Sequence, residues 1–198
     1  WTTPPHTYNI GPHSLTLSDT TGVPLSQVVL AGGQLVGLAN LQARSGALSG
    51  FGSVVVPEFM NHSAGRVAPG ANGSTGVGLL TFSGTFLSGG PFTPGAIDID
   101  LGGSLPSQYD RIAIAGSATR GGTLNVSLIN GFQPQPGSVF TIMTAASMSG
   151  QFATVNLAKP TIGGLSIEYT PTSVRIVYCA ADFNGDGGDV RIGTTFMM

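Results

Sequence analysis

The chain has 198 residues, enough for one sizeable core or one stack of repeats, and charged residues make up only 8% of it. Its hydrophobic fraction of 41% argues against disorder, which requires low hydrophobicity and high charge. A formal net charge of -2 leaves no footprint for nucleic acid or for an anionic membrane, and no apolar run is long enough to span a bilayer. We therefore expect a folded protein with no nucleic-acid partner and no membrane span.

Short runs in which apolar and polar residues alternate recur along the whole chain and predict half-buried β-strands. Glycine pairs such as Gly32-Gly33 and Gly121-Gly122 separate these runs and predict turns. No stretch has a convincing helical period, so we expect an all-β fold. The predicted strands include residues 15–17, 54–56, 79–82, 97–101, 112–114, 124–128, 140–142, 166–169 and 174–178.

A loose repeat over residues 27–90 refines the expected architecture. Short apolar pairs alternate with Ser or Thr and then Gly, for example over residues 33–37, 46–50 and 82–89. Very short strands with small residues at the corners are typical of a parallel β-solenoid, or β-helix. We expect solenoid rungs over residues 1–108, C-terminal rungs or a β-rich cap over 109–180, and a tail over 181–198. The alternative is a β-sandwich or jelly roll throughout.

Two segments carry a family resemblance. The first covers residues 63–70 and 78–84, and the second runs from 107–116 through 121–128 and 138–144 to 150–152. In this order they resemble the closing region of bacterial autotransporter-type and related surface β-solenoid repeats, over roughly residues 27–178. The resemblance implies a secreted or cell-surface protein with a structural or adhesive role, and it implies no catalytic residues.

The tail contains a segment similar to the first half of a dockerin-type, EF-hand-like calcium loop. Asp182, Asn184 and Asp186 stand at the positions whose side-chain oxygens bind the ion in such loops, and Gly187 stands where the chain turns sharply. Gly188 is placed to offer its backbone carbonyl. The predicted cofactor is therefore calcium, held by Asp182, Asn184, Asp186 and Gly188.

The loop departs from the calcium-binding pattern after these residues. Gly193 stands where a bidentate acid belongs, and residues 191–198 do not resemble the helix that follows a dockerin loop. We expect weak calcium binding, with a dissociation constant on the order of 10⁻⁴ to 10⁻³ M, that orders the tail. The alternative is a simple turn rich in Asp, Asn and Gly.

Three carboxylates in the predicted strands are candidates for chemistry. Asp98 and Asp100 share one face of a strand, as paired carboxylates do in some polysaccharide-active enzymes. We expect them instead to lie on a solvated outer face that keeps an edge from pairing. Both acids are expected to point outward. The residues expected to point inward are Ile97, Ile99, Leu101, Ile112, Ile114, Leu124, Val126 and Leu128. Asp110 and Arg111 belong to the family-like segment, and we expect a structural ion pair or turn contact. The sequence therefore predicts no catalytic residue.

The sequence as a whole predicts a non-catalytic structural or adhesive segment of a secreted bacterial surface protein. Its partner is expected to be a second copy or flanking chain, contacted through the first rung near residues 7–19. The alternative is a carbohydrate-binding or β-helix polysaccharide-active module with surface glycans as partners. Candidates for an aromatic sugar platform are Trp1, Tyr8, Phe51, Phe59 and Tyr109.

Overall fold

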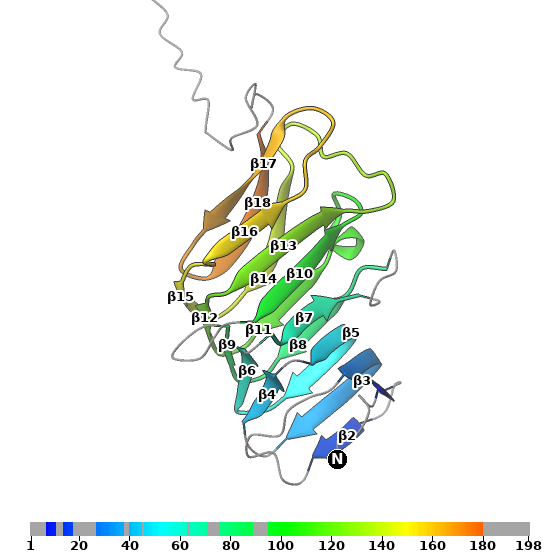
Figure 1. Ribbon diagram of the computed structural model, residues 1–198, viewed down its shortest axis with the longest axis vertical. Coiled ribbons are helices and arrows are strands. Elements are labelled where there is room, and N and C mark those ends of the chain that lie inside the picture. Colours follow the sequence, from blue (N-terminus) through cyan, green and yellow to red (C-terminus); the bar gives the residue numbers. More distant parts are fainter. Residues whose placement is uncertain are drawn as a thin grey trace, which may run out of the picture.

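The computed structural model describes residues 7–10, 14–17, 27–37, 40–44, 46–62, 64–70, 76–88 and 95–179. These residues form β-strands and one short 3₁₀ turn, η1 (Pro106–Gln108), so the all-β prediction is confirmed. The strands lie across the long axis of an elongated molecule, from β2 near the N-terminus to β17 at the far end (Figure 1). They belong to a 13-stranded sheet and a 5-stranded sheet.

The large sheet has two wings. The first wing is a run of parallel strands in which Ala96 lies opposite Thr123, and Thr123 lies opposite Thr154. Its members, from the N-terminal end, are β1 (Thr7–Ile10), the first halves of β3 (Gln27–Gly37) and β5 (Ala47–Val55), β7 (Arg66–Pro69), β10 (Ala96–Leu101), β13 (Thr123–Leu128) and β16 (Thr154–Leu157).

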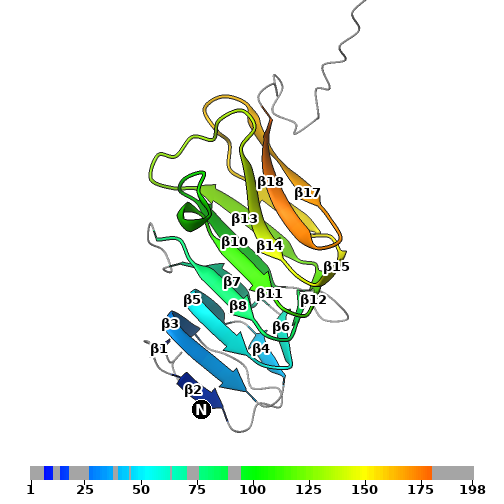
Figure 2. The same ribbon diagram turned by 180° about the vertical axis from the view of Figure 1, so that it is seen from behind.

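The second wing begins in parallel and ends with two antiparallel strands, visible side by side from behind (Figure 2). The large sheet is therefore mixed and not purely parallel, because the last two pairings of this wing are antiparallel. The members of this wing are β2 (Ser14–Leu17), the second halves of β3 and β5, β8 (Leu79–Phe82), β11 (Arg111–Ile114), β14 (Val139–Thr144), β18 (Ser173–Cys179) and β17 (Gly164–Tyr169).

The small sheet faces the wings across the core, and all of its strands are parallel. The strands of the small sheet lie in the same order as in the sequence, so each strand pairs with the next strand of this sheet along the chain. The members are β4 (Leu41–Arg44), β6 (Glu58–His62), β9 (Thr85–Leu87), β12 (Ser117–Arg120) and β15 (Ser147–Gly150).

Glycines let β3 and β5 run across both wings. Gly32 has a φ of +85°, and the pairing between β3 and β5 shifts register between Ala31 and Gln34 but continues on both sides. The prediction of a turn at Gly32-Gly33 is therefore wrong, because the strand bends there without reversing. At Gly50, with a φ of +93°, an added Cβ would lie only 1.8 Å from the carbonyl oxygen of Leu30. That position therefore requires glycine.

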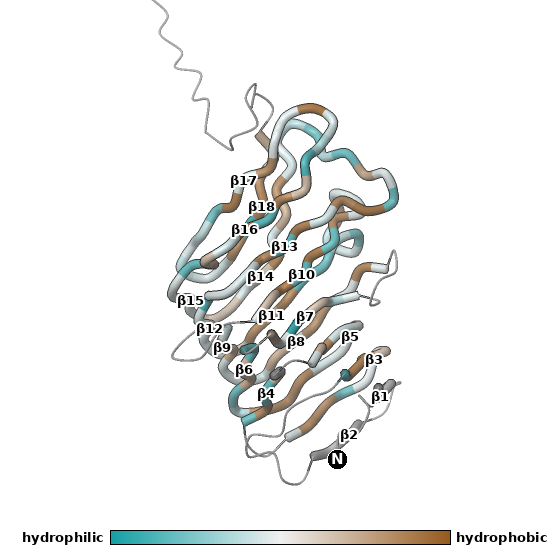
Figure 3. Tube along the Cα trace, viewed as in Figure 1, coloured by the Kyte–Doolittle hydropathy of each residue, from teal (hydrophilic) through white to brown (hydrophobic). Residues whose placement is uncertain are grey.

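One continuous hydrophobic core extends from Val28 to Tyr178 between the wings and the small sheet. It is continuous because apolar residues recur at alternate positions along the strands, and Figure 3 shows them interleaved with hydrophilic residues. The predicted inward residues Ile97, Ile99, Leu101, Ile112, Ile114, Leu124 and Val126 are buried, whereas Leu128 is only partly buried.

Three phenylalanines form the densest aromatic group in this core. The ring centroid of Phe82, on β8, lies 5.0 Å from that of Phe59 on β6 and 5.0 Å from that of Phe86 on β9. The rings of Phe59 and Phe86 are stacked, with centroids 5.6 Å apart. The group therefore ties the second wing to the small sheet.

The hairpin of β17 and β18 closes the C-terminal end of the second wing and of the small sheet. Met148, on β15, donates its backbone N–H to Pro171 at the hairpin turn, over 2.7 Å. Arg120 is only 8% exposed, donates to the carbonyls of Ser149 and Thr170, and lies 5.0 Å from the ring centre of Tyr169. Burial lowers the pKa of Arg120, so this closure holds a desolvated guanidinium in place.

Candidate functional site

Asp98 and Asp100 lie on the outer face of the first wing, as predicted. The Asp98 side chain binds residues of the two neighbouring strands. Its carboxylate forms an ion pair with Arg66 on β7 and accepts a 2.7 Å hydrogen bond from the Asn125 side chain on β13. Asn125 in turn accepts from Asn156 on β16, over 2.8 Å. Burial, and then the charge of Asp98, raise the pKa of Asp100. These contacts make a polar ladder that links four strands.

Asp110 is the most enclosed acid in the described part of the chain, with 1% of its surface exposed. Its two carboxylate oxygens accept backbone N–H bonds from Gly78, over 2.7 Å, and from Asp100, over 2.9 Å. Asp110 therefore makes a turn contact and joins β10 to the residues that precede β8. Burial raises its pKa to about 7, and the two N–H bonds offset part of the rise.

The three aspartates are neighbours, because the charges of Asp100 and Asp98 both contribute to the raised pKa of Asp110. Among the described residues, no group of three or more His, Cys, Asp or Glu side chains is placed to hold a metal ion. The predicted calcium ligands Asp182, Asn184, Asp186 and Gly188 lie outside the described residues.

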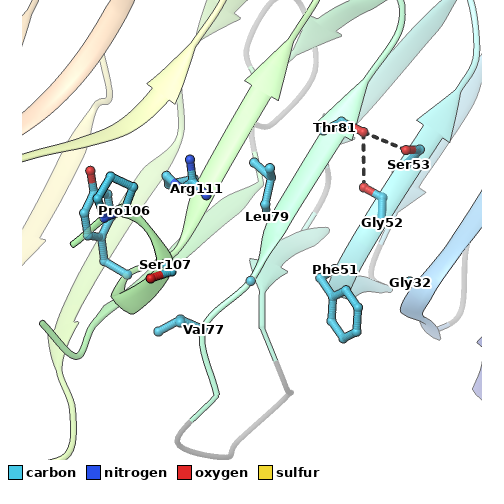
Figure 4. A pocket seen from close by; sticks show the side chains of 12 residues that line it. Gly32, Phe51, Gly52, Ser53, Val77, Leu79, Thr81, Pro106, Ser107 and Arg111 are labelled. Carbon is cyan, nitrogen blue, oxygen red and sulfur yellow. Dashed lines mark hydrogen bonds between the residues drawn. The ribbon is translucent and has the colours of Figure 1, made fainter.

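The described part of the chain has a groove on the outside of the second wing. Its volume is about 480 Å³, and it lies between β5, β8, β11 and the η1 turn (Figure 4). Polar residues and apolar residues both contribute to its lining. The principal side chains are those of Phe51, Ser53, Leu79, Thr81, Ser107 and Arg111.

The register of the strands assembles this groove. Ser53 on β5 lies opposite Thr81 on β8, and Leu79 on β8 lies opposite Arg111 on β11. The hydroxyls of Thr81 and Ser53 are 2.8 Å apart and hydrogen-bonded. Because alternate residues of a strand point to the same face, each of these strands presents its outward residues to one surface.

Phe51 supplies the exposed aromatic surface of the groove. Its side chain is 52% exposed, beside the strand bend at Gly32. Two other predicted sugar-platform residues, Phe59 and Tyr109, are 0% and 5% exposed, so their assignment to an exposed platform is wrong. Both are core residues because they belong to the inward set of side chains. Trp1 lies outside the described residues, and the side chain of Tyr8 does so too.

Arg111 supplies the positive charge of the groove. No described acidic side chain lies within ion-pair distance of it, and its buried Nε has no hydrogen-bond partner among the described residues. The predicted ion pair with Asp110 does not form, because that carboxylate binds the N–H groups of Gly78 and Asp100 instead. Within the described ranges, the guanidinium therefore has no counter-charge at the groove.

The fold and the groove define an all-β protein of stacked strands with a mixed large sheet. No protein-family model matches the sequence, and no curated protein matches it significantly. In the part of the chain that the structure describes, no helix is long and apolar enough to cross a membrane.

Proposed function

We propose that this chain is a non-catalytic, structural segment of a secreted or cell-surface protein, and that its parallel strands are the rungs of a β-solenoid. The observation that supports this most is the difference between the two ends of the stack. At the C-terminal end an antiparallel hairpin covers β14 and β15. At the N-terminal end, among the described residues, β4 pairs with β6 alone and β1 and β2 pair with β3 alone.

The two ends predict different behaviour towards other chains. An edge strand exposes N–H and C=O groups that pair readily with another strand. Two C-terminal edge strands remain, β16 and β17, each paired with one strand only. β16 is followed, after Ala158, by Lys159 and Pro160, and β17 carries the exposed charge of Glu168, all of which discourage edge pairing. We therefore assign strand addition to the N-terminal end, which we call the open end: β1, β2 and β4.

The contacts of the buried and half-buried aspartates and the low charge of the chain are consistent with a structural role. Asp98 and Asp110 hold strands together, because their carboxylates accept 2.7 Å hydrogen bonds from the Asn125 side chain and the Gly78 N–H respectively. A low-charge stack of strands provides extended surface at little electrostatic repulsion between copies. The resemblance to surface repeat proteins supports the proposed extracellular location.

Self-association follows from a single open end. A contact made by the same surface on both copies closes after two chains, so we expect a dimer and not a fibre. Sedimentation velocity over a rising series of protein concentrations should show a second species with twice the mass of one chain. A single chain at every concentration would contradict the proposal.

A pair of matched variants locates the contact. Gln42→Lys places a cation on β4 at the open end, whereas Ser149→Lys places one on β15 beneath the hairpin, in the same sheet. We expect Gln42→Lys to weaken dimerisation about tenfold or more by edge repulsion, and Ser149→Lys to leave it unchanged. Both variants should keep the circular dichroism spectrum of the wild type.

A further inference from the structure

We propose that the groove on the second wing binds a carboxylate-bearing saccharide, with Arg111 pairing the carboxylate and Phe51 packing against a sugar ring. This would be a ligand site on the flank of the stack, away from the open end. It rests on the groove's own residues and does not depend on self-association.

The size and lining of the groove suit a sugar. A volume of about 480 Å³ falls in the range of small-molecule sites, roughly 300 to 1,000 Å³. Hydroxyls of Ser53, Thr81 and Ser107 lie along it, and a hydroxyl both donates and accepts hydrogen bonds. A sugar ring has the matching chemistry, because its hydroxyls do the same around an apolar ring face.

Phe51 is held where a ring face can dock. One side of the Phe51 ring packs against the bend at Gly32, where an added Cβ would lie only 3.2 Å from Cε2 of the ring, so glycine leaves room for the ring in this position. Phe51 is 52% exposed at the mouth of the groove, whereas Phe59, Phe82 and Phe86 are buried, so about half of its surface is open to solvent. Its apolar face is available to a ligand.

Arg111 selects the charge of the ligand. A guanidinium with no acidic partner among the described residues attracts an anion, and its planar fork matches a carboxylate bidentately. Charge complementarity therefore favours an acidic saccharide over a neutral one.

Calorimetry with three probes tests the ligand class: a hyaluronan hexasaccharide, which carries carboxylates, neutral chitohexaose, and a hexaglutamate peptide. We expect binding of the acidic saccharide, and at least about tenfold weaker binding of the other two. Added salt should weaken the acidic saccharide's binding. No heat with hyaluronan at millimolar concentration would overturn the proposal, and so would equal binding of hexaglutamate.

Variants test the two residues separately. Arg111→Gln and Phe51→Ala should each weaken hyaluronan binding about tenfold or more, and Arg111→Lys should restore only part of the affinity because the fork is lost. The control is Arg175→Gln, which removes an exposed arginine paired with Glu168 on the capping hairpin. Thermal unfolding checks that each variant is folded. Unchanged affinity in Arg111→Gln would refute the site.

Discussion

Replacing Phe86 by alanine is expected to lower the free energy of unfolding by about 3 to 5 kcal/mol, the usual cost of deleting a buried phenylalanine. Phe86 is 0% exposed and contacts the rings of Phe59 and Phe82. Its strand, β9, has only three residues, so few other side chains of this strand can move to fill the cavity that the substitution leaves. Urea unfolding monitored by circular dichroism measures the loss.

The matched control is Phe51→Ala, which deletes the same side chain from a site that is 52% exposed. We expect it to change the free energy of unfolding by less than about 0.5 kcal/mol. If the two variants were equally stable, the aromatic group would not be part of a packed core, and the arrangement of the small sheet against the second wing would be wrong.

Asp110→Ala is expected to cost about 2 to 4 kcal/mol, because it leaves two backbone N–H groups without acceptors. Those groups belong to Gly78 and Asp100, and they lie next to an acid that is only 1% exposed. Glu168→Ala is the control, since it removes an acid of similar chemistry from an exposed ion pair with Arg175. That pair should contribute no more than about 1 kcal/mol.

The raised pKa of Asp110 gives the same residue a pH signature. With a pKa of about 7 in the folded state and about 3.9 in the unfolded state, the folded protein holds an extra proton between these values. The contribution of Asp110 to the free energy of unfolding is therefore greatest below about pH 4. It falls by up to about 1.4 kcal/mol per pH unit as the pH rises towards 7, and then levels off.

Asp110→Asn isolates this titration. The amide does not ionise, so the fall in stability between pH 4 and pH 7 should flatten, leaving only the smaller slope from Asp100, whose pKa is also raised. At pH 5 the variant should be less stable than the wild type, because an amide offers one acceptor where the carboxyl group offers two. An unchanged slope would show that Asp110 is not buried as described.

Much of the strand layout was predictable because it depends on local alternation. Residues 97–101 and 124–128 alternate strictly, and they lie in β10 and β13 with Asp98 outward and Ile97 inward. The prediction of a turn at Gly32-Gly33 was wrong, because a positive φ at glycine is compatible both with a tight turn and with a bend inside a continuous strand. Local pattern does not distinguish these two outcomes.

The groove was not predictable from local pattern, because its residues come from separate passes of the chain. Phe51 and Arg111 are far apart in sequence and meet only through the register that places β8 between β5 and β11. Nor does any single motif show that Arg111 has no acidic partner, since its sequence neighbour is Asp110. The closest signal was the choice of Phe51 as a candidate aromatic platform residue.

We infer that one end of the stack is open to strand addition and that the other is closed. Pulsed electron spin resonance on two singly labelled proteins tests it, with Cys179→Ser as the background because Cys179 is the chain's only cysteine. One label replaces Asn40 beside β4, and the other replaces Lys159 beside β16; both positions are exposed.

With strands about 4.8 Å apart, contact through the open ends places two Asn40 labels within roughly 25 Å, and two Lys159 labels beyond roughly 50 Å. We expect these distances in concentrated protein. Equal distances for the two labels, or no coupling between Asn40 labels at any concentration, would contradict the account.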